Sequence, residues 1–169
     1  MNNLSFLSFF RPSYPDLVHQ GVARTVALQT LILTLLAISF KQPLLLSFVV
    51  FEFLVRTLYG PRFSLVSRIA KTFQPLLFAS DDKKLAGSPK RFAQFAGLLF
   101  SASAGIAWLL TGQFTWPFYL LAVLTIFSAL EAIVGWCAAC FVFNYLMKIG
   151  LVPESVCVKC AKLEYDSRA

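Results

Sequence analysis

Four long apolar runs constrain this chain more than any other feature of its sequence. A bilayer core needs about 20 apolar residues in each helix that crosses it, and apolar runs cover residues 22–40, 43–59, 92–110 and 116–147. Charged residues make up only 14% of the 169 residues, whereas hydrophobic residues make up 58%. Because a soluble domain lacks the polar surface to cover so much apolar chain, we expect an all-α integral membrane four-helix bundle.

Short polar breaks separate the runs. Lys41-Gln42-Pro43 breaks the chain after the first run, and its proline begins the second. The Gly-Pro pair at 60–61 ends the second run, and the turn at 111–113 precedes the fourth. Glycine and proline both stop helices. Since no linker rich in Gly, Ser or Pro divides the chain, the sequence predicts a single membrane domain over residues 1–169, with a cytoplasmic tail at 148–169.

The fourth run is too long for one straight membrane helix. A continuous helix over residues 116–147 would measure about 48 Å, against a bilayer core of about 30 Å. We therefore expect it to project from the membrane or to bend near Gly135. On a straight helix Glu131 and Cys140 would lie on opposite faces, so Glu131 can serve the thiols only if the helix bends.

The segment at residues 61–91 intersperses apolar and basic side chains with helical spacing. Its apolar members are Phe63, Leu65, Val66, Ile69, Phe73, Leu76 and Leu77, set among Arg62, Arg68 and Lys71. Such a pattern predicts an amphipathic interfacial helix on the membrane surface, between the second and third spans. The alternative is a capping helix packed on the bundle.

The same segment holds most of the positive charge between the runs. The chain has a net charge of +7, and the 61–91 segment contains Arg62, Arg68, Lys71, Lys83, Lys84, Lys90 and Arg91. The loop between the first two runs contains only Lys41, and the loop between the last two contains no basic residue. Because cytoplasmic loops carry the excess of Lys and Arg, both termini are predicted to be cytoplasmic. This charge orients helices among membrane lipids, so no nucleic-acid partner is expected.

Two Cys-x-x-Cys pairs, Cys137/Cys140 and Cys157/Cys160, carry the strongest indication of chemistry. The predicted topology places both on the cytoplasmic side, where thiols are kept reduced and structural disulfides are rare. Lys159 lies inside the second pair and favours the reactive thiolate. We therefore predict a thiol–disulfide or sulfur relay, in which Cys157 or Cys160 reacts with a soluble partner and passes the oxidation to Cys137 and Cys140. A quinone is a candidate final acceptor, although nothing in the sequence identifies one.

The spacing of the four cysteines also leaves a zinc site open. Sixteen residues separate the two pairs, which is within the range of a tetrathiolate zinc site in a non-enzymatic protein. Cys137 and Cys140, however, are expected about 60° apart on one face of an apolar helix, whereas zinc ligands usually occupy polar turns. Such apolar surroundings also disfavour the thiolate, and inert packing cysteines are a third interpretation.

The candidate functional charges inside the apolar runs are Glu52, Arg56 and Glu131. A charge inside a membrane is costly and requires a partner or a function. Glu52 and Arg56 are four residues apart, so we expect an ion pair that locks the bundle. Glu131 is expected to neutralise Arg24 or Arg56 across the bundle. A small transporter subunit is the other function that these charges favour.

The third run contains small residues at a regular spacing. Gly97, Ser101 and Gly105 are four residues apart. Residues at this spacing share one helix face. The pattern predicts close contact between this helix and a neighbour.

Four motifs are specific in combination: FEFLVR at residues 51–56, GPRFS at 60–64, PKRFA at 89–93 and EAIVGWCAAC at 131–140. With them the chain resembles, over nearly its entire length, the bacterial membrane protein family catalogued as domain of unknown function 4395. The resemblance implies a small multi-pass protein of the bacterial inner membrane, with occasional association with thioredoxin-like or rhodanese-like cytosolic proteins. It implies no established activity and no set of catalytic residues.

Overall fold

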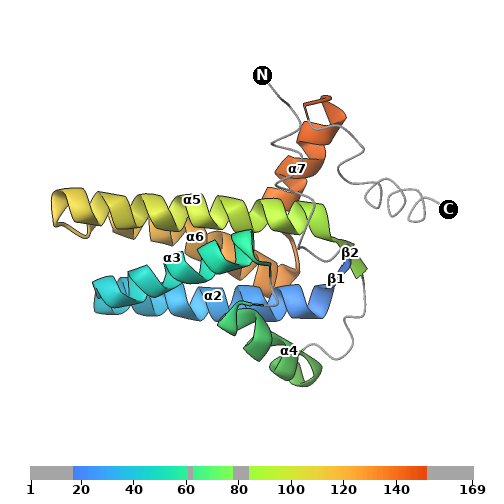
Figure 1. The fold of residues 1–169 in the computed structure, drawn as a ribbon, viewed down its shortest axis with the longest axis horizontal. Coiled ribbons are helices and arrows are strands. Elements are labelled where there is room, and N and C mark those ends of the chain that lie inside the picture. The colour runs from blue at the N-terminus through green and yellow to red at the C-terminus, as the bar shows by residue number, and fades with distance from the viewer. Residues whose placement is uncertain (1–16, 61–62, 78–83, 152–169) are drawn as a thin grey trace.

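The computed structural model describes residues 17–60, 63–77 and 84–151. These residues form six helices and two short strands. Four helices run side by side along the long axis of the molecule, each opposite in direction to the one before it (Figure 1). They are α2 (Gln20–Phe40), α3 (Pro43–Leu58), α5 (Gly87–Thr111) and α6 (Thr115–Val134). Helices α2 and α5 each pack against both α3 and α6, so the four enclose a common interior.

Three of these helices, α2, α5 and α6, are long and apolar enough to cross a membrane. This confirms the helical class, and it indicates a membrane protein. Helix α3 has only 16 residues, which corresponds to about 24 Å. The run at residues 43–59 therefore gives a helix shorter than a usual membrane span.

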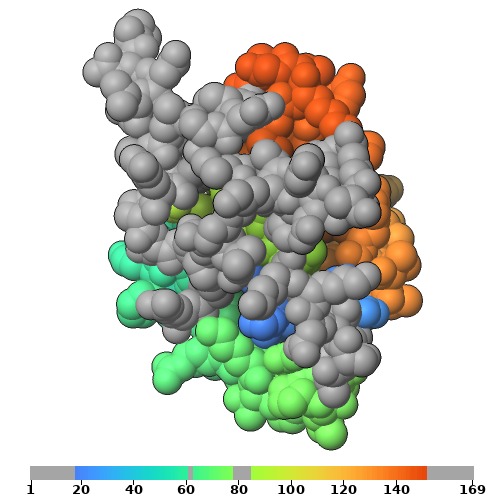
Figure 2. Space-filling model, turned by 90° about the vertical axis from the view of Figure 1, so that its right-hand side faces the viewer, coloured from blue at the N-terminus to red at the C-terminus, as the bar shows by residue number. Residues whose placement is uncertain are grey.

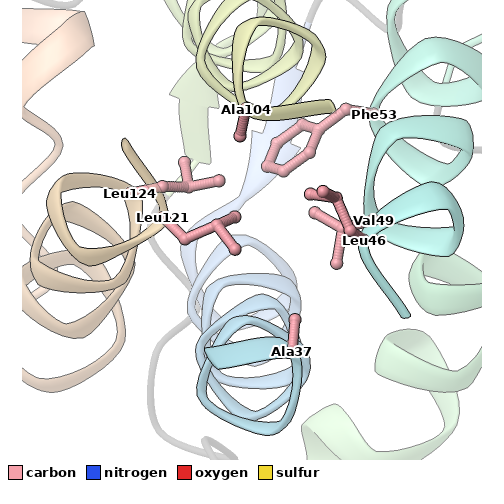
Figure 3. Close-up of a cluster of buried hydrophobic side chains, with 7 residues drawn as sticks. All are labelled: Ala37, Leu46, Val49, Phe53, Ala104, Leu121 and Leu124. Atoms are coloured by element: carbon pink, nitrogen blue, oxygen red, sulfur yellow. The ribbon is translucent and has the colours of Figure 1, made fainter. Parts of the chain in front are cut away.

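The centre of the interior is apolar. Buried side chains from all four helices meet there (Figure 3). They are Ala37, Leu46, Val49, Phe53, Ala104, Leu121 and Leu124. Burial of apolar surface of this kind, together with close packing, holds the helices against one another.

Helices α3 and α5 approach closely at Gly97, as the small-residue spacing predicts. A methyl group added at Gly97 would come within 2.7 Å of Cζ and 2.8 Å of Cδ1 of the Phe53 ring. The Phe53 side chain is itself buried, so its ring has little room to move. At Gly105, by contrast, the added carbon would meet Val50 at 3.8 Å, an ordinary contact.

Replacing Gly97 by Ala should therefore destabilise the fold by about 1–3 kcal/mol, the usual cost of overpacking a core. Gly105→Ala is the matched control on the same helix, and it should be neutral or slightly stabilising because Ala favours a helix more than Gly does. Denaturant unfolding in mild detergent measures both. Equal stability of the two variants would contradict the close contact.

Helix α6 ends at Val134, so the run at residues 116–147 does not form one helix, and of the two expected outcomes the bend near Gly135 is the one observed. Gly135 adopts a left-handed conformation with φ of 76°, and its N–H donates to the carbonyl of Glu131 at 3.1 Å. Glycine adopts this conformation without steric cost. The chain resumes as helix α7 (Ala138–Lys148), which leaves the bundle at the end where α5 begins (Figure 1).

Helix α7 is held by a contact with the start of α5. The rings of Phe143 and Phe92 lie with their centroids 5.6 Å apart. Phe143 is 1% exposed and is the only buried residue of α7. Phe143 is therefore the most deeply buried contact that α7 makes with the start of α5.

Helix α4 (Leu65–Leu77) packs on the outside of α2, where Val66 and Ala70 contact Val26. The contact between α4 and α2 is the packing that the capping-helix alternative predicts. Its remaining large apolar side chains are exposed: Leu65, Ile69, Phe73, Leu76 and Leu77. Helices α4 and α7 lie on opposite sides of the same end of the molecule (Figure 2).

Two short strands, which the all-α prediction did not include, join at this end. Strand β1 (Leu17–His19) pairs antiparallel with β2 (Lys84–Ala86), and Val18 faces Leu85 in the register. Each strand leads directly into a helix, β1 into α2 and β2 into α5. The pairing therefore fixes the starts of these two helices beside each other.

Candidate dithiol site

Cys137 and Cys140 lie at the start of α7 and form a disulfide, with their Cα atoms 5.2 Å apart. Both side chains are half-buried. The expected placement of both cysteines within one continuous helix is wrong, because Gly135 ends α6 before them. Cys137 instead caps α7, and its Sγ accepts the N–H of Cys140 at 3.2 Å.

The N-terminal position changes the expected reactivity of Cys137. The first N–H groups of a helix have no partner within the helix, and they carry a partial positive charge. In the reduced pair these groups would favour a thiolate on Cys137, which is the nucleophilic form. Cys137 is thus placed for thiol chemistry despite its apolar neighbours in the sequence.

Arg24 of α2 holds the end of α6 that precedes the disulfide. Its Nε donates to the carbonyl of Ala132 at 3.1 Å and its Nη2 donates to that of Ile133 at 2.7 Å. These are carbonyls of the last helical turn, where a cation is favourable. Arg91 makes a similar but longer contact, 3.5 Å from Nη2 to the carbonyl of Thr57 near the end of α3.

Replacing Gly135 by Ala should alter the disulfide as well as the fold. A left-handed alanine costs about 1–2 kcal/mol, and its Cβ would lie 2.8 Å from Nε2 of Gln20. We expect loss of stability and a changed rate of disulfide reduction by dithiothreitol, because Gly135 directs the chain into the site. Gly112→Ala is the control, since Gly112 is also left-handed but meets no atom within 4 Å. If dithiothreitol reduced the disulfide of Gly135→Ala and that of Gly112→Ala at the wild-type rate, this role of Gly135 would be wrong.

Glu131 pairs with Lys90, a cation that the sequence did not single out. The Lys90 ammonium on α5 donates to Oε1 of Glu131 on α6. The Lys90 side chain is 7% exposed and that of Glu131 is 19% exposed. The expectation that Arg24 or Arg56 would face Glu131 is thus corrected: the observed ion pair joins α5 to α6.

Glu52 and Arg56 are both buried on α3, where Nε of Arg56 donates to the backbone carbonyl of Glu52 at 3.2 Å. The expected ion pair between these two described side chains is not observed, because the Glu52 carboxylate is hydrogen-bonded to Ser64 instead. Oε2 of Glu52 accepts the hydroxyl of Ser64 at 2.6 Å, and Ser64 Oγ accepts the N–H of Ser67 at 3.1 Å. Nη1 of Arg56 donates to Oγ1 of Thr30 at 3.4 Å. Glu52 therefore anchors the start of α4, and Arg56 joins α3 to α2.

Glu131 and Cys137 line one cavity of about 480 Å³. The bend at Gly135 brings them together, as the sequence required for any cooperation between Glu131 and the thiols. Arg56 and Lys90 also line it, whereas Glu52 does not. Lys90, which the sequence indicated only as one of several basic residues, and Ser67 are among the lining residues that no local pattern relates to the cysteines.

A metal site is not tested by the described residues. Within residues 17–60, 63–77 and 84–151, no three His, Cys, Asp or Glu side chains group as metal ligands. The tetrathiolate alternative needs Cys157 and Cys160, which lie outside the described residues. In the oxidised state described, Cys137 and Cys140 bind each other.

Comparison with known proteins gives a family and no activity. The family model described as "Domain of unknown function (DUF4395)" matches residues 18–148. This range includes α2 to α7, the Lys90–Glu131 pair and the Cys137–Cys140 disulfide. No curated protein and no solved structure matches the chain.

Proposed function

Since the chain belongs to the DUF4395 family of unknown function, we propose from its own residues that it is a multi-pass membrane protein that exchanges disulfides with a dithiol partner. The observation that supports this best is the Cys137–Cys140 disulfide at the N-terminus of α7, half-buried beside a cavity. A disulfide between residues three apart constrains the unfolded chain less than a longer loop would. This favours an exchangeable bond over a structural one.

The membrane arrangement that we propose has four spans, α2, α3, α5 and α6, in the bacterial inner membrane. The short α3 would cross a locally thin bilayer or be covered by its longer neighbours. Basic residues of the described chain gather at the end that carries the disulfide: Arg24, Arg56, Arg68, Lys71, Lys90 and Arg91. Lys41 is at the opposite end, so the disulfide end and both termini are assigned to the cytoplasm.

Helix α4 is proposed to lie at the cytoplasmic surface of the bilayer. One face packs on α2, while Leu65, Ile69 and Phe73 are exposed beside the basic Arg68 and Lys71. Exposed apolar side chains would enter the acyl region, and the two cations would meet lipid headgroups. Membrane lipid is therefore a partner of this helix.

In the proposed reaction, a cytosolic thioredoxin-like dithiol reduces a Cys157–Cys160 disulfide and is itself oxidised. The thiolate of Cys157 or Cys160 then attacks the Cys137–Cys140 disulfide, and one sulfur of that pair leaves as a thiolate. A second attack releases two thiols at Cys137 and Cys140 and restores the Cys157–Cys160 disulfide. Two electrons and two protons thus pass from the partner to Cys137 and Cys140, so the inner pair is reduced, which reverses the direction expected from the sequence. A rhodanese-like partner would instead transfer a sulfane sulfur to one reduced thiol.

Replacing Cys157 by Ser tests this order. A thioredoxin-like protein that lacks its resolving cysteine should form a trapped mixed disulfide with the wild-type chain, and Cys157→Ser should abolish it. Cys137→Ser is the control, because it leaves the outer pair intact and should retain the complex. Non-reducing gel analysis reads the result, and capture by Cys157→Ser at the wild-type level would overturn the order.

Two other functions remain as alternatives. Four thiolates could bind zinc and tie the tail to α7 without any enzyme activity, as the spacing of the two pairs allows. A small transporter subunit would use the cavity and its charged lining, Arg56, Lys90 and Glu131. The pairing of Lys90 with Glu131 favours a structural role for these charges over an ion pathway.

A further inference from the structure

The cavity beside the disulfide extends from Cys137 into the apolar interior of the bundle. Its volume of about 480 Å³ lies within the usual range of small-molecule sites. Cys137 lines it, and its apolar wall includes Phe53, Phe100, Leu124 and Phe127 from three helices of the bundle. A ligand here would lie against the redox-active sulfur and among aromatic side chains.

The cavity also contains polar atoms whose hydrogen bonds are unmade. Ser67 is fully buried, and its Oγ has no hydrogen-bond partner among the described residues. Oε1 of Gln94 has none among them either. A buried hydroxyl or amide without a partner costs about 1–3 kcal/mol, so both atoms favour a ligand that can accept and donate hydrogen bonds.

We propose that this cavity binds a quinone, and that the quinone reoxidises Cys137 and Cys140; this inference rests on the proposed function. A quinone ring is apolar and planar, as the aromatic wall requires, and its carbonyl oxygens accept hydrogen bonds from groups such as the Ser67 hydroxyl and the Lys90 ammonium. The hydroquinone formed can donate to Gln94 Oε1. The quinone would thus supply a partner for Ser67 Oγ, and the hydroquinone would supply one for Gln94 Oε1.

The oxidation of the two thiols by the quinone needs no other reactant. Cys137 and Cys140 lose two electrons and two protons as their sulfur–sulfur bond forms, and the quinone gains both to become a hydroquinone. The thiolate favoured at the helix N-terminus begins the transfer, since Cys137 is the cysteine that lines the cavity. Electrons supplied by the dithiol partner would therefore leave through the membrane quinone pool.

The test uses the full chain in mild detergent, reduced with dithiothreitol and freed of it anaerobically. Decylubiquinone is the probe, and its reduction is followed at its ultraviolet absorbance together with thiol loss. We expect one hydroquinone for each disulfide formed, and therefore two per chain when all four cysteines start reduced, because Cys157 and Cys160 are reoxidised through Cys137 and Cys140. Ala96→Phe, which fills the cavity wall, should slow this oxidation at least tenfold, whereas Ala107→Phe on the same helix, outside the cavity lining, should match wild type.

Each outcome separates this inference from the proposed function. A wild-type chain that exchanges with thioredoxin but does not reduce decylubiquinone overturns the quinone site alone. Equal rates for Ala96→Phe and wild type also overturn it, provided that circular dichroism shows both folded. Quinone reduction without any exchange with a dithiol protein would support the cavity and reject the partner. Oxidation of Ala96→Phe by diamide at the wild-type rate shows that its thiols remain competent.

Discussion

In a chain whose Cys157 and Cys160 are already replaced by Ser, replacing Cys137 by Ser should reduce disulfide exchange with a dithiol to the rate of the uncatalysed background. Without Cys137 the disulfide at the start of α7 cannot form, and the sulfur that lines the cavity is lost. Cys140→Ser should behave differently, because Cys137 remains at the N-terminal cap, where the thiolate is favoured. It should react once with a disulfide substrate and remain trapped as a mixed disulfide.

The rate of thiol–disulfide exchange with 5,5'-dithiobis(2-nitrobenzoate) or oxidised glutathione is measured for both variants. Cys157 and Cys160 are replaced by Ser in each, so that only the thiol at position 137 or 140 reacts. Thermal unfolding of the two variants is the control, since the same disulfide is lost in each. Equal reactivity of the single thiols Cys137 and Cys140 would contradict the role assigned to the helix N-terminus.

Replacing Lys90 by Met should destabilise the protein by about 3–5 kcal/mol, the usual cost of leaving one member of a buried ion pair without its partner. Glu131 would lose the cation that joins α6 to α5. The double variant Lys90→Met, Glu131→Gln should recover most of this loss, because no uncompensated charge remains. Denaturant unfolding in detergent gives the two free energies.

An exposed cation on the same side of the molecule provides the control. Lys71→Met removes a positive charge from the exposed surface of α4, and surface charges of this kind contribute about 1 kcal/mol or less. Lys90→Met and Lys71→Met with similar stability would show that the Lys90–Glu131 pair contributes little. The same conclusion would follow if the double variant Lys90→Met, Glu131→Gln were as unstable as Lys90→Met alone.

The helices followed from composition and length, because an apolar run of sufficient length has few alternatives to a helix in lipid. The starts of α2 and α3 were predicted within about two residues, and Gly135 was recognised as the place where the fourth run would bend. Strands β1 and β2 were not predicted, since two three-residue strands that pair across more than sixty residues leave no periodic signal. The bounds of α3 were predicted within one residue, but its 16 residues are fewer than a usual membrane span.

The site was less predictable than the fold. The two cysteines were identified from their spacing, but their position at a helix N-terminus depended on where α6 ends. Lys90 and Glu131 are 41 residues apart, and only the packing of α5 on α6 brings them together. Glu52 was expected to pair with Arg56, whereas its carboxylate is hydrogen-bonded to Ser64. Long-range partners of this kind are set by packing, which a single sequence does not encode locally.

Metal analysis with thiol counting tests the central claim most directly, on full-length protein purified anaerobically without chelators. Disulfide exchange predicts no bound zinc, and two or four thiols that appear and disappear reversibly with a thioredoxin couple. About one zinc per chain, with four thiols that react only after chelation, would contradict it and would establish the tetrathiolate site instead.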